Sequence, residues 1–329
     1  MTETEPHTQP IVTIVVAPRE RYGMTELALD SLCQNTDTPH ELVYVAGRAP
    51  RKLRTVLRTR AAREGFQLIE TPHHITPNQA RNLGLARVRT PFVVFIDNDL
   101  FVTPGWLDRL LQAAEETEAW VVGPLYLEGD PSGDVIHMAG GAYELSGEFG
   151  LRTFRADHLL QRQKISELST PLQRTRCDFV EFHCMLVRTE VFDKLGTLDE
   201  KLWNTREHLD LCLLVTEAGG SVWLEPNSTV VYMNPPPLAW SDLRFFSLRW
   251  SDEWSRASIQ HFRAKHGIEP TYRQNLDDYR KRRQRILFDP VFDAVRKVAG
   301  RNVGRAVRRA LRAVEPAVNR LASRAPMNI

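Results

Sequence analysis

The sequence contains few cysteines, no long apolar run and almost no net charge. Its four cysteines, at positions 33, 177, 184 and 212, form no CxxC pair, so they suggest neither a zinc site nor a disulfide framework, and a reducing, cytoplasmic location is the expectation. The strongest apolar run, residues 92–96, is far shorter than the roughly 20 residues of a membrane span. The polar residues 1–10 lack the apolar core of a signal peptide, and no internal repeat is visible. An ordinary soluble globular protein is therefore the expectation.

Charge is distributed unevenly along the 329 residues. The whole sequence has 43 Lys and Arg against 41 Asp and Glu, a net charge of +2. Residues 273–329 hold 15 basic and 5 acidic residues, a net charge of +10, whereas residues 1–272 hold 28 basic and 36 acidic residues, a net charge of −8. This split predicts a globular domain over residues 10–270 and a basic helical extension over residues 271–329, with different partners.

Apolar stretches rich in β-branched residues alternate with helical patterns in the first part of the chain. We expect strands at residues 11–17, 41–46, 66–70, 92–96 and 120–122. We expect helices between them at residues 25–34, 51–64, 77–86 and 103–116. This alternation predicts an α/β fold with a doubly wound, mainly parallel sheet, in which ligands bind at the carboxyl ends of the strands.

The pattern changes after residue 127. Residues 129–150 are rich in Gly, Ser, Asp and Glu, and residues 158–173 are polar and aperiodic, which predicts a hairpin insertion and a mobile loop over the site. Ordered structure is expected again at residues 179–188, where residues 178–184 precede a short strand. Strands are expected at 221–225 and 229–233, and helices at 189–195, 207–218 and 238–266.

Two carboxylates, Asp97 and Asp99, follow the apolar strand at residues 92–96. No Lys or Arg stands beside them in the sequence, so we expect an unneutralised pair at the carboxyl edge of the sheet. Hard carboxylate oxygens suit Mg²⁺ or Mn²⁺, and such an ion would balance the charge of a departing nucleoside diphosphate. The alternative is a turn in which Asp and Asn side chains cap the next helix.

The segment ARNLG at residues 80–84 precedes the strand-end motif VVFIDND at residues 93–99. In this order the two motifs resemble the family 2 glycosyltransferases with the GT-A fold, and the resemblance covers about residues 10–233. It implies a doubly wound mixed sheet with flanking helices and a nucleotide-sugar donor. It also implies a hydroxyl acceptor on a glycan, a lipid-linked glycan or another molecule.

The resemblance implies roles for individual residues as well. The residues after the first strand would line the base and ribose pocket: Ala17, Pro18, Arg19 and Glu20. Arg81, Asp97 and Asn98 would contact the donor, and Asp99 would be the principal metal ligand with help from Asp97. Taken alone, Arg81 would more simply form an ion pair on a helix surface.

Metal-using relatives commonly add a histidine ligand near the end of the last strand. This chain has Asn234 there instead. His208 or Asn234 would substitute for that histidine, or Asp99, the diphosphate and water would hold the ion.

The segment WNTREHLDL at residues 203–211 resembles the E-D-x-D-L helix start of the family, in which the second acid is often the base of inverting enzymes. That position is His208 here, so His208 or Glu207 is the candidate base, and Asp210 shares a helix face with Glu207. His208 would alternatively ligate the metal. The simpler interpretation is a capped helix, with Thr205 as N-cap and acids in the first turn.

Candidate acceptor contacts come from two segments. Glu181 and His183 lie on one side of the extended segment before residue 184 and would face the acceptor side of the cleft. Trp203 resembles the aromatic residue on which acceptor sugars stack in the family. The competing interpretations are a buried, hydrogen-bonded histidine and a core tryptophan.

The basic extension begins with a dense cationic run at residues 280–285. Farther on, apolar residues recur at helical spacing among arginines: Val307, Leu311, Val314, Val318 and Leu321. This pattern predicts a basic amphipathic helix on an anionic membrane surface, with Pro316 as a candidate kink. The alternative is a helix packed against the domain or a second subunit. No nucleic-acid partner is expected, because interleaved aromatics and a reader motif are missing.

Together these features predict a cytoplasmic, Mn²⁺- or Mg²⁺-assisted glycosyltransferase with inverting chemistry, held on the inner face of the membrane by its tail. The main alternative is a catalytically silent GT-A-like module that binds nucleotide or serves as a scaffold. A nucleotidyltransferase of sugar phosphates fits less well, because the chain lacks the Gly-rich N-terminal loop with Lys or Arg that triphosphate binding needs.

Overall fold

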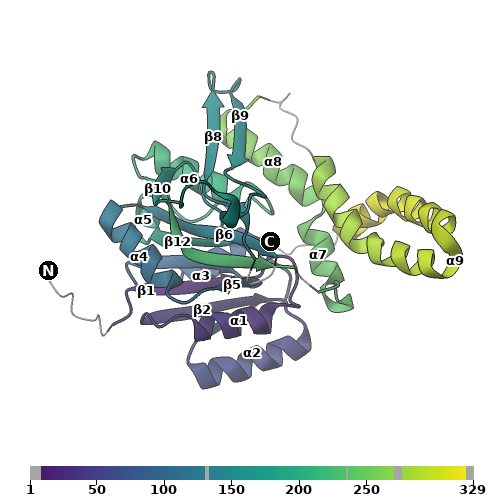
Figure 1. Cartoon of the computed structure of the whole chain (residues 1–329), viewed down its shortest axis with the longest axis horizontal. Coiled ribbons are helices and arrows are strands. Elements are labelled where there is room, and N and C mark those ends of the chain that lie inside the picture. Colours follow the sequence, from purple (N-terminus) through teal and green to yellow (C-terminus); the bar gives the residue numbers. More distant parts are fainter. Residues whose placement is uncertain (1–8, 130–132, 235, 270–275, 324–329) are drawn as a thin grey trace.

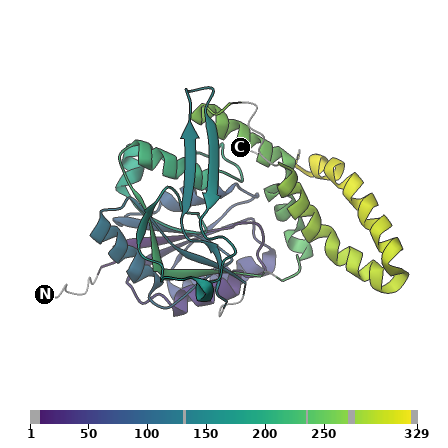
Figure 2. The ribbon, with the colours of Figure 1, turned by 45° about the horizontal axis from the view of Figure 1, so that its top comes forward.

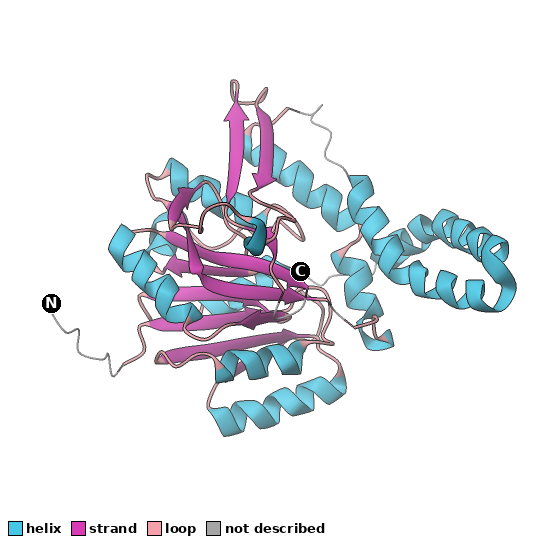
Figure 3. Cartoon of the chain, in the orientation of Figure 1, coloured by secondary structure: helices cyan, strands magenta, loops and turns pink. Residues whose placement is uncertain are grey.

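The computed structural model describes residues 9–129, 133–234, 236–269 and 276–323 (Figure 1). A ten-stranded sheet lies at its centre, in the order β10-β12-β6-β11-β4-β1-β2-β3, with β5 beside β12 and β7 beside β6. Helices flank the sheet, and a separate two-stranded hairpin and a helical arm project from it (Figure 3). The predicted α/β class, with a mixed sheet and a helical tail, is confirmed.

The parallel half of the sheet is built from strands that are apolar on both faces. β1 (Val12–Ala17) and β4 (Phe92–Asp97) are buried at every position, as expected for strands covered on both sides. β1 pairs in parallel with β4 and with β2 (His40–Gly47), which pairs with β3 (Gln67–Glu70). The register places Ala17 opposite Asp97, so the loops after β1 and β4 start at the same edge.

The other half of the sheet mixes strand directions. β11 (Cys184–Arg188) is antiparallel to β4 and to β6 (Val121–Gly129), whereas β12 (Val222–Met233) is parallel to β6. β11 begins beside the end of β4, and the Asp97 amide donates to the His183 carbonyl at 3.0 Å. Short strands complete the sheet: β5 (Leu100–Val102), β7 (Val135–Met138) and β10 (Thr175–Cys177).

Six helices lie close to their predicted positions. Four of them follow successive strands: α1 (Thr25–Gln34), α2 (Arg51–Glu64), α3 (Pro77–Leu85) and α4 (Trp106–Thr117). Two more lie in the second half, α5 (Glu190–Leu195) and α6 (Glu207–Glu217). α3 and α6 matter most for the site, because both begin at the carboxyl edge of the sheet.

Several predicted segments differ from the structure. Residues 221–225 and 229–233 form one strand, β12, which continues across an irregularity where the Asn227 amide donates to the Glu225 carboxylate at 2.9 Å. The projecting hairpin is β8 (Gly141–Ser146) with β9 (Thr153–His158), later in the chain than the expected 129–150. Of that segment, residues 130–132 lie outside the described residues. Residues 158–173 include a short 3₁₀-helix, η1 (Ile165–Glu167). Residues 179–183 precede the short strand β11, as expected.

The single helix expected over residues 238–266 is divided. It consists of η2 (Trp240–Asp242), α7 (Leu243–Arg249) and α8 (Asp252–His266). The break has a local cause, because the Ser251 side chain accepts from the Trp254 amide at 3.1 Å and so caps the start of α8. A cap at this point overrides the apolar periodicity that runs through both helices.

The basic extension forms one element, α9 (Leu276–Ser323), which folds back on itself (Figure 2). The reversal occurs at Gly300, whose φ of 84° is open to glycine at little steric cost, whereas Pro316 lies inside the second helical arm. The predicted boundary at residues 270 and 271 lies outside the described residues. Among the residues that the structure describes, no helix combines the length and apolar character needed to cross a membrane.

Candidate active site

A cavity of about 330 Å³ opens at the carboxyl ends of β1 and β4. Its wall holds five arginines, Arg19, Arg81, Arg206, Arg249 and Arg282. It also holds four histidines, His137, His158, His183 and His208, and three carboxylates, Asp97, Glu181 and Glu207. Cations outnumber carboxylates, so the cavity suits a polyanionic ligand of small-molecule size.

Asp97 lies at the centre of the polar wall. Its carboxylate is 3.6 Å from the Arg19 guanidinium and 3.4 Å from the Arg81 guanidinium, and it contacts the His183 ring at 2.7 Å. Burial alone would raise the pKa of Asp97, but His183 and the two arginines lower it. The expectation of an unneutralised pair is therefore wrong for Asp97, because both arginines reach it from distant parts of the sequence.

Asp99 has a different environment, although it is only two residues away. It is 2% exposed, and both carboxylate oxygens are buried without a hydrogen-bond partner. Burial raises the pKa of Asp99 to about 7. A buried carboxylate without a partner is unstable as an anion. A divalent cation with a preference for hard oxygen ligands would supply the missing charge, so this residue fits the expected metal ion.

The local sequence of α3 explains the position of Arg81. Pro77 occupies the first turn, and Thr76 and Gln79 form a reciprocal capping box across the start of the helix. From the next turn, Arg81 reaches Asp97 while its guanidinium stacks on the Phe182 ring, 4.1 Å from the ring centroid. Arg81 is 4% exposed, so it lies in the site and not on a helix surface.

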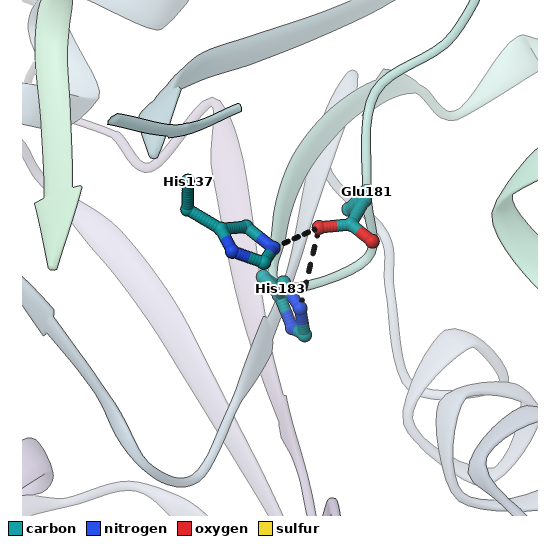
Figure 4. Close-up of side chains that lie close together, drawn as sticks. All are labelled: His137, Glu181 and His183. Atoms are coloured by element: carbon teal, nitrogen blue, oxygen red, sulfur yellow. Dashed lines mark hydrogen bonds and ion pairs between the residues drawn. The ribbon is translucent and has the colours of Figure 1, made fainter. Parts of the chain in front are cut away.

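Four imidazoles surround the Glu181 carboxylate. One oxygen, Oε2, is 3.0 Å from His137 Nε2 and 3.3 Å from His183 Nε2 (Figure 4), and the other is 3.5 Å from His158 Nε2. His208 belongs to a second group with His158 and Glu181, in which all ligand atoms lie within 4.8 Å of one another. Burial alone would raise the pKa of Glu181, but the imidazoles hold it well below its usual range.

The start of α6 brings two of the three predicted catalytic residues to the cavity. Glu207 and His208 line its wall, and Glu207 lies 4.0 Å from the Arg249 guanidinium. Burial lowers the pKa of His208 to about 3, so its imidazole is neutral. Asp210 instead faces α8, where Lys265 and His266 each donate to it at 2.8 Å.

The remaining predicted residues lie behind the wall. Asn98 accepts from the Arg19 amide at 2.9 Å and donates to Thr25 at 2.8 Å, so it fixes the loop after β1. Burial alone would raise the pKa of Glu20, but Arg282, Arg19 and Arg21 lower it to about 2. Trp203 packs edge to face on Trp254, with ring centroids 6.3 Å apart. Ala17 and Pro18 are buried at the end of β1.

Several wall residues carried no signal in the sequence. His137 comes from β7, His158 from β9, Arg249 and Trp250 from the end of α7, and Tyr279 and Arg282 from α9. Apart from Arg282, which belongs to the cationic run at residues 280–285, none of them belongs to a local motif. Only the fold brings them together. A search for histidines near strand ends would have recovered His137, next to the end of β7, and His158, at the end of β9.

Comparisons with known proteins agree with this architecture. The model of the family "Glycosyl transferase family 2" matches residues 13–196, more than half of the chain. The O-antigen biosynthesis protein RfbC of Myxococcus xanthus is 27% identical over 216 residues, which cover 64% of this chain and 16% of that protein. The pre-mycofactocin glycosyltransferase of Mycobacterium tuberculosis is 26% identical over 168 residues, which cover 51% of this chain and 32% of that protein. The chain thus spans a third or less of the length of these curated relatives.

Two solved structures share the fold at low sequence identity. GalNAc-T7, solved with UDP, GalNAc and Mn²⁺, has a TM-score of 0.53 at 13% identity and covers 84% of this chain and 56% of its own. The mannosyltransferase PcManGT from Pyrobaculum calidifontis, solved with GDP-Man and Mn²⁺, has a TM-score of 0.51 at 12% identity. That alignment covers 97% of this chain and 84% of the other.

Proposed function

The chain belongs to glycosyl transferase family 2, and from this premise we propose that it transfers a sugar from a nucleotide-sugar donor to an acceptor hydroxyl. The observation that carries the proposal is the arginine-lined cavity at the carboxyl ends of β1 and β4. In an open α/β sheet this edge is where nucleotides bind. Two proteins of the same fold were solved with UDP or GDP-Man and Mn²⁺, which supports this donor class.

The arginines would bind the donor diphosphate. Arg19 and Arg81 hold fixed positions beside Asp97, and Arg206, Arg249 and Arg282 add three more cations to the same cavity. Guanidinium groups suit phosphate oxygens because they donate in a planar fork. Asp99, assisted by Asp97, would hold Mn²⁺ or Mg²⁺, which stabilises the negative charge of the nucleoside diphosphate as it leaves.

Glu207 is the base in this proposal. It is the first residue of α6, where the positive end of the helix favours an ionised carboxylate, and Arg249 lies beside it. Glu207 would remove the proton of the acceptor hydroxyl while that oxygen attacks the sugar. Because the attack comes from the face opposite the departing diphosphate, the configuration of the sugar carbon is inverted. His208, neutral in the same wall, would contact the acceptor hydroxyl, and Glu181 and His183 would complete that side.

The direct test mixes the purified full chain with a panel of UDP-, GDP- and dTDP-sugars, Mn²⁺ and glycan or lipid-linked acceptors. We expect binding of at least one donor and its slow hydrolysis even without an acceptor. Asp99→Ala should reduce turnover by about 100-fold or more, because the ion stabilises charge in the transition state. Circular dichroism would check that the variant is folded.

Failure would take two forms. If no sugar nucleotide binds and Asp99→Ala changes nothing, the proposal is wrong. If a nucleotide binds but no donor is consumed with any acceptor, the chain is the catalytically silent module that the sequence left open.

We further propose that the enzyme acts in the cytoplasm, at the inner face of a membrane. Support comes from the second arm of α9, where Val314, Val318 and Leu321 are 59%, 57% and 71% exposed and share one face. Exposed arginines flank this stripe, among them Arg309 and Arg320. An apolar stripe bordered by cations is typical of helices that lie in an anionic interface.

A further inference from the structure

We propose that His137, Glu181 and His183 form a site for a first-row transition-metal ion in the wall of the cavity, separate from Asp99. Nothing in the family resemblance assigns a metal to these residues. His137 comes from β7, and Glu181 and His183 come from the segment before β11; the three side chains lie close together (Figure 4). This proposal rests on the proposed function in one respect only, namely that the cavity beside the ion would hold the sugar donor and the acceptor.

The ligand atoms have the separations that a shared ion requires. One Glu181 oxygen lies 3.0 Å from His137 Nε2 and 3.3 Å from His183 Nε2, and all three ligand atoms lie within 4.8 Å of one another. Ligands about 2.1 Å from a common ion are roughly 3.0 to 3.4 Å apart in octahedral or tetrahedral geometry. The Glu181 oxygen and the two histidine nitrogens therefore need to move little to bind a common ion.

Both imidazoles are oriented from behind by a second carboxylate. Asp97 Oδ2 is 2.7 Å from His183 Nδ1, and Glu128 Oε2 is 3.4 Å from His137 Nδ1. Metal-bound histidines almost always donate their other ring N–H to such a group, which turns the free lone pair toward the ion. Each of the two rings therefore has one nitrogen toward Glu181 and the other toward a second carboxylate.

The types of ligand atom determine which metal ions the site prefers. Two imidazole nitrogens and one carboxylate suit Zn²⁺, Co²⁺, Fe²⁺ or Mn²⁺, whereas Mg²⁺ prefers oxygen ligands alone. Asp99 supplies only carboxylate oxygens and belongs to neither group of converging ligands among the described residues. The two sites thus differ in the ions they prefer, and all three residues of the histidine site line the cavity that would hold the donor and acceptor.

Cobalt provides the test, because Co²⁺ replaces Zn²⁺ and its visible absorption reports nitrogen ligands. The full chain is stripped with a chelator and titrated with Co²⁺ in the absence of nucleotide. We expect one equivalent of Co²⁺ to give the absorption of a nitrogen-ligated ion, and we expect His137→Ala and His183→Ala each to weaken this binding by about 10-fold or more. Asp99→Ala should keep the absorption spectrum, because Asp99 is not a ligand of this site.

His158→Ala is the matched control, since His158 also lines the cavity and lies 3.5 Å from the other Glu181 oxygen. It should bind Co²⁺ within about 3-fold of the wild type. The proposal is wrong if the folded wild type binds no Co²⁺, if both ligand variants keep the spectrum, or if Asp99→Ala loses it. These outcomes do not depend on sugar transfer, so they separate this proposal from the proposed enzyme activity.

Discussion

Glu207 and His208 are neighbours at the start of α6, but their surroundings give them different chemistry. The Glu207 carboxylate lies 4.0 Å from the Arg249 guanidinium, whereas His208 is a neutral ring beside Phe179, with ring centroids 5.7 Å apart. We expect Glu207→Gln to lower kcat by 10²- to 10⁴-fold, as loss of a general base does, with little change in the KM for the donor. Steady-state kinetics with the donor found in the panel would measure it.

His208→Gln is the comparison variant, because glutamine keeps a polar group of similar size in place of the neutral imidazole. It should lower kcat by less than about 10-fold and act mainly through the KM for the acceptor. A larger loss of kcat in His208→Gln than in Glu207→Gln would transfer the role of base to His208.

At this scale the sequence predicted some wall residues and missed others for a physical reason. Arg81, Asp97, Glu207 and His208 each belong to a short motif of neighbouring residues. For Arg81 the motif includes the capping box that starts α3. His137 has no such context, because β7 presents it without a special turn and its partner Glu181 is 44 residues away. Sequence spacing carries no information about contacts of that kind.

At the scale of elements, the glycine of the ARNLG motif has a packing role. A Cβ atom on Gly84 would lie 2.2 Å from Val15 Cγ1, so α3 lies directly on β1 at this point. We expect Gly84→Ala to reduce the free energy of unfolding by about 1 to 3 kcal/mol, because the helix must move away from the sheet. Urea denaturation of the variant and the wild type would measure the difference.

Gly23→Ala is the control for that substitution. Gly23 is exposed, and a Cβ atom there would meet only Pro236 at 3.4 Å, an ordinary contact. Its free energy of unfolding should stay within about 0.5 kcal/mol of the wild type. Equal stability of both variants would show that α3 tolerates a larger separation from β1.

Asp199 ties the segment after α5 to α8 and makes stability depend on pH. Its carboxylate is 2.8 Å from His261 and 3.0 Å from Lys265. Burial alone would raise the pKa of Asp199, but these partners lower it to about 2. Because the folded-state pKa lies below the unfolded value of about 3.9, the stabilisation is complete above pH 4 and is lost as the pH falls toward 2.

Asp199→Asn should therefore lower the free energy of unfolding at pH 7 by about 1 to 2 kcal/mol, after allowance for solvent screening. The gap to the wild type should close as the pH falls from 4 toward 2, which denaturation curves over this range would record. Glu190→Gln, at an exposed pair 3.9 Å from Lys194, is the control and should have almost no effect at any pH. A gap that stays constant with pH would mean that the carboxylate charge is not the cause.

Most elements were predictable because hydrophobic periodicity is a local property of the sequence. The errors occur where a tertiary contact or a single cap determines where an element begins or ends. The alternation that predicted β1, β4 and α3 is a property of ten or so neighbouring residues. The division of residues 238–266 depends on one cap at Ser251, and the union of β12 depends on its pairing with β6 on both sides of the irregularity at residues 226–228. Such boundaries depend on contacts of individual side chains and strands that the periodicity of a sequence window does not show.

At the scale of the whole molecule, the start of α9 is part of the globular domain. Arg283 is fully buried, 2.9 Å from Glu315 in the second arm and 3.0 Å from Asp252 in α8. Arg282 lies over the Trp250 ring and 3.7 Å from Glu20. The cationic run at residues 280–285 therefore places much of its charge against carboxylates within the chain, and the second arm offers the better surface for a membrane.

The final prediction concerns the binding of this surface to lipid vesicles. The triple variant Val314→Ser, Val318→Ser and Leu321→Ser should reduce co-sedimentation with phosphatidylserine-containing vesicles by about 10-fold or more, since burying each apolar side chain contributes about 1 kcal/mol or more. Leu27→Ser, at a 55% exposed leucine on α1, should bind like the wild type. Binding by the wild type should also weaken as salt rises, because arginines near the surface contribute about 1 kcal/mol each. The membrane proposal is wrong if all three proteins sediment equally or if the wild type does not sediment with the vesicles. The exposed stripe would then be a candidate surface for a protein partner.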